Sequence, residues 1–150
     1  MFVYFLIVVL AVLFDFGSKA LILDTLSRGE AIEVTPFFNI VFAMNTGISF
    51  SMFSNAGPWI LTAVAFVICA FIIYFIITEK DVFTRACLSL VLGGAIGNII
   101  DRIRFEAVVD FLDFHAFGYH WPAFNVADSC ICIGVVLLLF RMVLNKEKKK

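Results

Sequence analysis

Four long apolar segments decide what this chain can fold into. They lie at about residues 2–23, 58–78, 84–104 and 126–144, and each is close to the roughly 20 residues that a helix needs to cross a bilayer. Of the 150 residues, 63% are hydrophobic. A domain of this size cannot bury so much apolar surface in its own core. We therefore expect an all-α membrane protein, a single domain over residues 1–150 with four transmembrane helices.

The segments between the spans carry signals for β-structure. The first apolar segment lacks the basic start and the small-residue cleavage site of a signal peptide, so we interpret it as a span. Residues 24–57 and 105–125 then lie on one side of the membrane. Residues 48–52 alternate strictly between apolar and polar, and residues 38–43 and 107–114 are rich in β-prone side chains. These segments predict a small β-sheet, which must stay out of the hydrocarbon because its edges are unpaired.

The basic residues predict the orientation, because cytoplasmic loops carry an excess of lysine and arginine. With a cytoplasmic N-terminus, the inner side holds the larger basic group: Lys80, Arg85, Arg141, Lys146, Lys148, Lys149 and Lys150. The outer side holds the smaller group: Lys19, Arg28, Arg102 and Arg104. Both termini are thus expected to be cytoplasmic, and the sheet extracytoplasmic. The formal net charge of -1 gives no indication of nucleic-acid binding.

Polar residues gather at the outer ends of the predicted spans, although such residues are costly in a membrane and mark function by default. The group consists of Asp15, Lys19, Asn98, Asp101, Arg102, Asn125 and Asp128, with Asp110 and Asp113 just before the fourth span. Some of these residues can instead have purely structural roles. Asp15 and Lys19 are four residues apart and can form a local ion pair, and Asn125 can cap the fourth helix.

This polar layer offers carboxylates and few other catalytic groups. The chain has no G-x-S-x-G, C-x-x-C or H-E-x-x-H motif, so we expect no metal and no cofactor. Ser18 and Lys19 are adjacent and point about 100° apart on a helix, which argues against a dyad. Two neighbouring carboxylates can divide the roles of base and acid on water. The residues themselves do not choose between Asp110 and Asp113.

Five motifs along the chain point to a known family. They are DFGSK at residues 15–19, NTGISF at 45–50, GGAIGNIIDR at 93–102, VVDF at 108–111 and FNVADS at 124–129. In this order and spacing the chain resembles the bacterial lipoprotein signal peptidases, or signal peptidase II. The resemblance implies four transmembrane helices with an outward-facing β-cradle, in the bacterial cytoplasmic membrane.

The resemblance also implies an activity and its residues. The enzyme would be a metal-independent aspartyl endopeptidase that cuts diacylglyceryl-modified prolipoproteins just before the lipidated cysteine, and globomycin would inhibit it. The catalytic pair would be Asp110 and Asp128. The supporting residues would be Asp15, Lys19, Asn45, Gly47, Asn98, Asp101, Arg102 and Asn125. We expect Asp128 to be the base, because it lies at the positive end of the fourth helix.

Two other functions compete with this interpretation. A proton- or ion-coupled transporter would use the same carboxylates as a relay, but transporter sites lie near the midplane at a repeat interface, and no repeat is visible in this sequence. A structural scaffold would use the polar layer only for packing between helices. Asp→Asn substitutions separate the three functions, because only a peptidase loses cleavage while staying folded.

Overall fold

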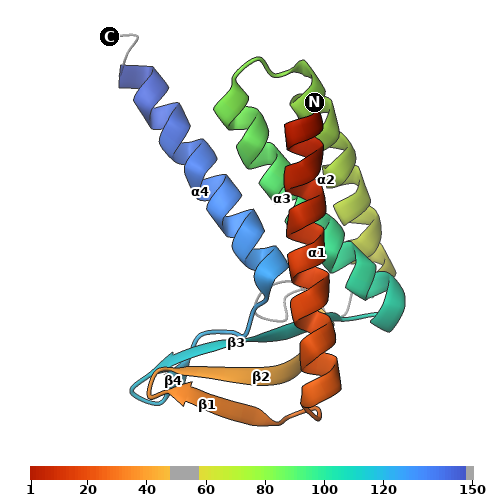
Figure 1. Ribbon diagram of the computed structural model, residues 1–150, viewed down its shortest axis with the longest axis vertical. Coiled ribbons are helices and arrows are strands. Elements are labelled where there is room, and N and C mark those ends of the chain that lie inside the picture. Colours follow the sequence, from red (N-terminus) through yellow and green to blue (C-terminus); the bar gives the residue numbers. More distant parts are fainter. Residues whose placement is uncertain (48–57, 148–150) are drawn as a thin grey trace.

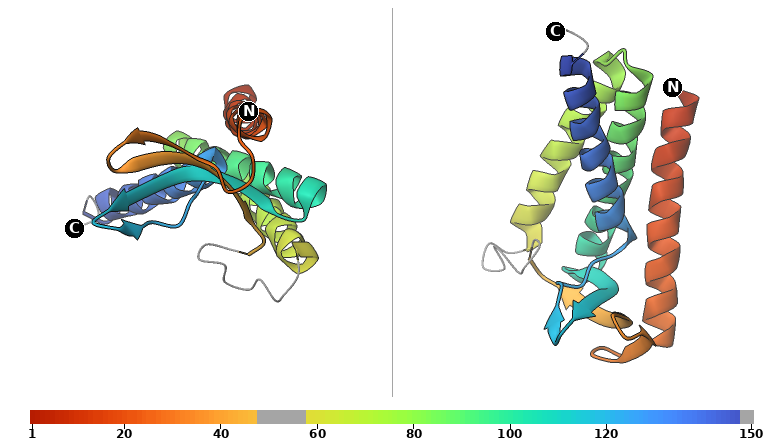
Figure 2. Two further views of the ribbon diagram at one scale, coloured as in Figure 1. Left: turned by 90° about the horizontal axis from the view of Figure 1, so that it is seen from below. Right: turned by 90° about the vertical axis from the view of Figure 1, so that its left-hand side faces the viewer.

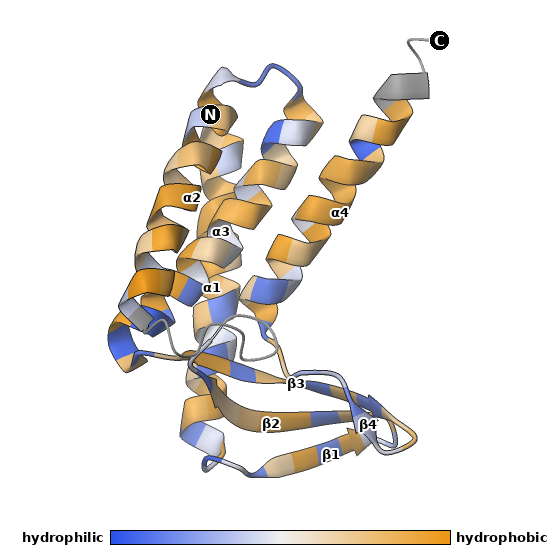
Figure 3. Cartoon of the chain, turned by 180° about the vertical axis from the view of Figure 1, so that it is seen from behind, coloured by the Kyte–Doolittle hydropathy of each residue, from blue (hydrophilic) through white to orange (hydrophobic). Residues whose placement is uncertain are grey.

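The computed structural model describes residues 1–47 and 58–147. Its four long helices run side by side (Figure 1) and are long and apolar enough to cross a membrane. They are α1 (Phe2–Thr25), α2 (Pro58–Thr78), α3 (Val82–Phe105) and α4 (Val126–Glu147). The four helices were predicted, and their bounds lie within a few residues of the predicted segments. Most residues of the four helices are hydrophobic (Figure 3). Large apolar side chains such as Phe5 and Phe71 are more than 60% exposed, as lipid-facing residues are.

A four-stranded antiparallel sheet lies across one end of the helices, and the start of α1 and the end of α4 lie at the opposite end (Figures 1 and 2). Its strands are β1 (Ala31–Thr35), β2 (Phe38–Asn45), β3 (Val108–Ala116) and β4 (Tyr119–His120), in the order β1-β2-β3-β4. The strands predicted at 38–43 and 107–114 are confirmed. The alternating segment at 48–52 lies outside the described residues, and β1 was not predicted because most of its side chains are exposed and its pattern is weak.

The two faces of the sheet have different surroundings. Side chains alternate along a strand, but the amides of Phe111 and Leu112 both donate to the carbonyl of Phe124, so β3 is bulged there and Asp110 and Asp113 lie on one face. On the other face, Val109 and Phe111 pack against Ile22 and Leu26 at the end of α1. On the Asp110 face, that aspartate meets Asn125 at the start of α4. The sheet therefore holds Asp110 against the ends of the helices.

Helix α3 is the centre of the bundle and packs closely against α1 and α4. A methyl group built on Gly93 would lie 2.6 Å from Cβ of Ala11, and one on Gly97 would lie 2.5 Å from Oδ2 of Asp15. Small residues permit this approach of helix backbones in a membrane. At Gly97 the missing side chain is what makes room for a carboxylate between the two helices.

Candidate active site

A buried ammonium group ties three helices together at the sheet end of the bundle. Nζ of Lys19 lies 2.8 Å from Asp15 and 2.9 Å from Asp101, and it donates to Oδ1 of Asn98 at 3.2 Å. Lys19, Asp15 and Asp101 are each at most 2% exposed. A lysine has three donor hydrogens, so these three acceptors saturate it. The predicted Asp15–Lys19 ion pair is thus present, and Asp101 completes it from α3.

The two carboxylates that hold Lys19 also accept backbone hydrogen bonds from other elements. Oδ1 of Asp15 accepts from the amide of Ala127, in the first turn of α4, at 2.8 Å. Oδ2 of Asp101 accepts from the amide of Val109, on β3, at 3.0 Å. These contacts fix the positions of the two segments that follow, and each of those segments carries one of the predicted catalytic aspartates.

Two buried amide side chains connect the aspartates Asp110 and Asp128. Asn98 donates to Oδ1 of Asp128 at 2.8 Å, and Asn125 donates to Oδ1 of Asp110 at 2.7 Å. The Nδ2 group of Asn125 is also 3.2 Å from Oδ1 of Asn98. Because Lys19 can only donate, its bond to Asn98 identifies the oxygen of that amide and leaves the nitrogen for Asp128. Hydrogen bonds therefore run without a break from one aspartate to the other.

Asn125 also has the predicted capping role. Its Oδ1 accepts from the backbone amide of Asp128 at 2.8 Å, which satisfies one free amide in the first turn of α4. The residue is fully buried. One side chain therefore both starts α4 and holds Asp110, so the structural and the functional interpretations of Asn125 describe the same contact network.

The environment of Asp110 favours its protonated form. The residue is 2% exposed, and burial raises the pKa of its carboxyl from 3.8 to about 7. The nearby charge of Asp128 also raises this pKa, whereas the hydrogen bonds from Asn45 and Asn125 lower it. Asn45 donates to Oδ2 at 2.9 Å, so both oxygens of Asp110 accept an amide hydrogen bond. Near neutral pH this carboxyl can hold and release a proton.

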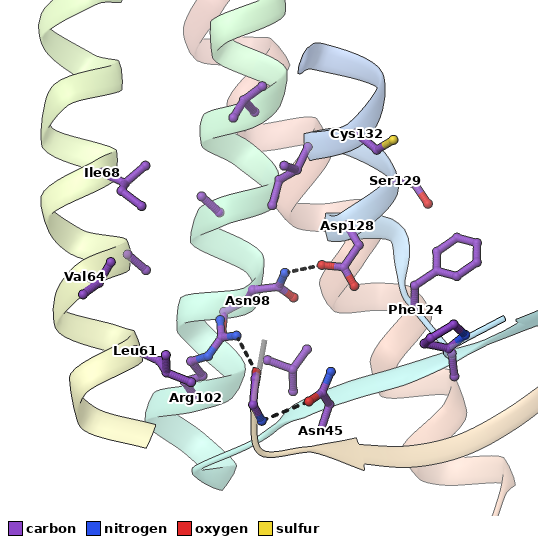
Figure 4. A pocket seen from close by; sticks show the side chains of 18 of the residues that line it. Asn45, Leu61, Val64, Ile68, Asn98, Arg102, Phe124, Asp128, Ser129 and Cys132 are labelled. Carbon is purple, nitrogen blue, oxygen red and sulfur yellow. Dashed lines mark hydrogen bonds between the residues drawn. The ribbon is translucent and has the colours of Figure 1, made fainter. Parts of the chain in front are cut away.

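Asp128 lies at the mouth of an apolar groove. The groove has a volume of about 770 Å³ and is lined by α2, α3, α4 and the segment before α4. Its walls are mostly aliphatic, with Leu61, Val64 and Ile68 on α2, whereas Asp128, Asn98 and Arg102 form its polar end (Figure 4). From Leu61 to Ile72 the groove follows twelve residues of α2, or about 16 Å of helix. It has the form of a site for an apolar chain with a polar group at its end.

Arg102 and Gly47 close the polar end of the groove opposite Asp128. The guanidinium donates to the carbonyl of Gly47 at 3.3 Å and lies 3.5 Å from the carbonyl of Asn98. The amide of Gly47 donates to Oδ1 of Asn45 at 3.0 Å. All ten residues predicted for the site are thus linked to one another by hydrogen bonds or ion pairs.

Asp113, the alternative that the sequence left open, belongs to a different set of contacts. It accepts from Asn39 at 3.0 Å and lies 2.9 Å from Nδ1 of His120. It lies further along β3 than Asp110 and, like Asp110, is not among the residues that line the groove. Position along β3 separates the two aspartates: Asp110 lies where the strand passes the start of α4, and Asp113 lies toward the far end of the strand.

The residues that form the groove walls could not be identified from the sequence. The aliphatic residues of α2 that line the groove cannot be told from those that face lipid, since both occur in one uniformly apolar span. Neither could the backbone amides of Val109 and Ala127 be identified as ligands of the buried carboxylates. Within residues 1–47 and 58–147, no three His, Cys, Asp or Glu side chains are grouped as metal ligands.

The chain is similar to known membrane peptidases over nearly its whole length. The family model described as "Signal peptidase (SPase) II" matches residues 7–144. A lipoprotein signal peptidase of Syntrophotalea carbinolica is 49% identical over 140 residues, covering 89% of this chain and 86% of the relative. One of Alteromonas mediterranea is 41% identical over 145 residues, covering 93% and 80%. A solved structure described as a bacterial membrane enzyme superposes with a TM-score of 0.92 at 35% identity, covering 100% of this chain and 93% of that one.

Proposed function

Because this chain belongs to the signal peptidase II family, we propose that it removes signal peptides from prolipoproteins whose cysteine carries a diacylglyceryl group, cutting just before that cysteine. The observation that carries the proposal is the pair Asp110 and Asp128, joined through Asn125 and Asn98 beside the mouth of an apolar groove. The similarities give no support to the competing prediction of an ion-coupled transporter.

In the proposed mechanism the two aspartates act as an acid and a base. Asp128 lies in the first turn of α4, where the helix dipole favours negative charge, and it takes a proton from a water as that water attacks the scissile carbonyl carbon. Asp110, whose pKa of about 7 lets it hold a proton, donates to the carbonyl oxygen. The tetrahedral intermediate then collapses: Asp110 takes a proton back from one of its hydroxyls, Asp128 gives its proton to the nitrogen of the lipidated cysteine, and the C–N bond breaks to release that cysteine as an amine. This chemistry is of the aspartic type and needs no metal.

The other eight site residues would act by positioning. Lys19, held by Asp15 and Asp101, orients Asn98 toward Asp128, and Asn125 orients Asp110. Asn45 restrains the second oxygen of Asp110. Arg102 and Gly47 stand at the groove end, where a donor and a backbone carbonyl can receive an extended substrate peptide.

The groove would receive the apolar part of the substrate. Its 16 Å of aliphatic wall suits an acyl chain, whose burial contributes about 0.8 kcal/mol per CH₂. The polar end would then bring the peptide bond next to the lipidated cysteine to the aspartates. Membrane lipid would fill the groove when no substrate is bound.

We also propose a location and an orientation. The protein would lie in the bacterial cytoplasmic membrane with both termini in the cytoplasm and the site at the outer face. The excess of lysine and arginine at the end that holds the termini supports this orientation. It agrees with a substrate whose lipidated cysteine lies at the outer surface.

The test is cleavage of a diacylglyceryl-modified prolipoprotein by the purified protein in detergent, followed as a gel shift. Wild type is compared with Asp110→Asn, Asp128→Asn and the matched control Asp113→Asn, with EDTA and globomycin in further lanes. We expect cleavage by wild type and Asp113→Asn, with EDTA present or absent, and none by the other two variants or with globomycin. Activity of folded Asp110→Asn or Asp128→Asn would contradict the assignment, and loss of activity with EDTA would contradict its metal-free form.

A further inference from the structure

Arg85 lies at the end of the helix bundle opposite the site, in the first turn of α3. The start of α1 and the turn that joins α2 to α3 both lie at this end (Figure 1). Nη2 of Arg85 donates to Sδ of Met1 at 2.6 Å, and Cζ lies 4.2 Å from the centre of the Tyr4 ring. The guanidinium is therefore held in the seam between α1 and α3 by a thioether and an aromatic ring.

The carboxylates near Arg85 in the sequence are engaged by other groups. Asp81 accepts from Nη2 of Arg141 at 2.7 Å and from its Nε at 3.3 Å. Glu79 accepts from the backbone amides of Lys80 and Asp81 at 2.6 and 2.9 Å. Of the side chains that the structure describes, no carboxylate lies within ion-pair distance of the Arg85 guanidinium. No direct contact within the described part of the chain thus balances its positive charge.

The hydrogen-bonding groups of Arg85 are also largely unused. A guanidinium has five N–H donors in a planar fork, and its only acceptor among the described residues is a thioether, which accepts weakly. The Nε atom is buried without an acceptor, and the residue as a whole is half-buried, so water reaches only part of the fork. A cation that is partly buried and incompletely hydrogen-bonded is costly, which favours an anionic acceptor at the terminal nitrogens.

The depth of Arg85 in the membrane indicates which acceptor that is. Val82 and Phe83, just before it on α3, are 69% and 41% exposed, and the apolar stretch of α3 follows, so Arg85 lies where the span begins. This is the level of lipid headgroups, whose phosphates match a guanidinium bidentately. Basic pockets between membrane-spanning helices bind acidic headgroups in other proteins. Lys80, exposed in the turn before α3, adds a second positive charge.

We propose that the seam between α1 and α3 at this end binds the phosphate of an anionic phospholipid, with the terminal nitrogens of Arg85 as the specific contact and Lys80 adding attraction at longer range. The ring of Tyr4 stabilises the guanidinium from the protein side by a cation–π contact. The phosphate supplies the acceptor oxygens that the protein lacks, and the acyl chains lie along the apolar surfaces of α1 and α3. A bound lipid thereby holds the start of α1 against α3. The proposal rests on the four spanning helices and does not depend on the catalytic assignment.

The test is titration of the detergent-solubilised full chain with phosphatidylglycerol, followed by native mass spectrometry. Wild type is compared with Arg85→Gln and with the matched control Arg104→Gln, which removes one charge at the other end of α3, where the guanidinium also lies over aromatic rings but is exposed. We expect Arg85→Gln to bind about tenfold more weakly, because charge-assisted hydrogen bonds are lost, and Arg104→Gln to bind as wild type does. Phosphatidylcholine, which has no net charge, and glycerol phosphate, which has no acyl chains, should both bind wild type more weakly than phosphatidylglycerol.

Equal affinity of wild type and Arg85→Gln for phosphatidylglycerol would overturn the proposal, and so would an equal loss in Arg104→Gln, because net charge alone would then explain binding. Phosphatidylcholine that binds as tightly as phosphatidylglycerol would contradict an anionic ligand, and glycerol phosphate that binds as tightly would contradict a lipid one. If Arg85→Gln loses its circular dichroism, Arg85→Lys replaces it, since it keeps the charge and loses the planar fork. Several-fold weaker binding by Arg85→Lys is then expected, and unchanged binding would refute the guanidinium contact.

Discussion

Removing the hydrogen bond from Asn45 to Asp110 gives a direct measure of how the site sets the acidity of that carboxyl. An amide that donates to a carboxylate stabilises the charged form, so Asn45→Ala should raise the pKa of Asp110 above its value of about 7. If Asp110 is the proton donor, activity is lost as pH rises through this pKa. The alkaline limb of the pH–rate profile should therefore move upward.

The structure sets the size of this shift. A hydrogen bond to a charged group contributes about 1.5–3 kcal/mol, and about 1.4 kcal/mol corresponds to one pKa unit. Because Asn45 is half-buried, water can replace part of the lost bond, so the lower end of the range applies. We expect the limb to move up by about one pH unit.

The sheet offers a matched control for this variant. Asn39 donates to Asp113 at 3.0 Å across the same two strands, as Asn45 donates to Asp110 at 2.9 Å. Asn39→Ala should leave the profile unchanged, because Asp113 belongs to a separate set of contacts with Asn39 and His120. The assay is the initial rate of prolipoprotein cleavage from about pH 5 to 9, a range that brackets the raised pKa of Asp110.

Three results would refute the reasoning. An unchanged alkaline limb in Asn45→Ala would show that Asp110 does not set it. A shift of the acidic limb instead would make Asp110 the base and Asp128 the acid. An equal shift in Asn39→Ala would show a general effect of the sheet, with no specific role for the Asn45–Asp110 bond.

Three further substitutions test the buried network by thermal unfolding and cleavage. Lys19→Met should lower the free energy of unfolding by about 3–5 kcal/mol, because it leaves Asp15 and Asp101 buried without their cation. A melting temperature like that of wild type would contradict the three-way ion pair. Gly97→Ala should lower the free energy of unfolding by about 1–3 kcal/mol, because the added methyl group overpacks against Asp15. An unchanged melting temperature would mean that α1 and α3 can separate freely. Asn125→Ala removes the cap of α4, so it should lower the free energy of unfolding by about 1–2 kcal/mol. It should also lower the cleavage rate by about 10²-fold or more. Loss of stability with full activity would limit Asn125 to capping.

The sequence by itself determined the class of fold and the place of the site. Four uniformly apolar segments have few stable alternatives to spanning helices, since each backbone polar group in lipid must be satisfied within its own helix. The polar residues at one end of these spans, from Asp15 in the first to Asp128 in the fourth, marked the site because their burial in lipid needs compensation. These inferences depend on local composition, which a sequence displays directly.

The tertiary structure decided the identities that depend on packing. Whether Asp110 or Asp113 meets the start of α4 is set by where β3 passes the helices, and the residues of the strand do not display that position. The other two partners of Lys19, Asp101 and Asn98, come from α3, and a local pattern on α1 could reveal only Asp15. The groove is formed by apolar residues of α2 and α4 that match their lipid-facing neighbours in type. A sequence lists which side chains are apolar, but only the arrangement of the helices determines whether lipid or a cavity lies beside each one.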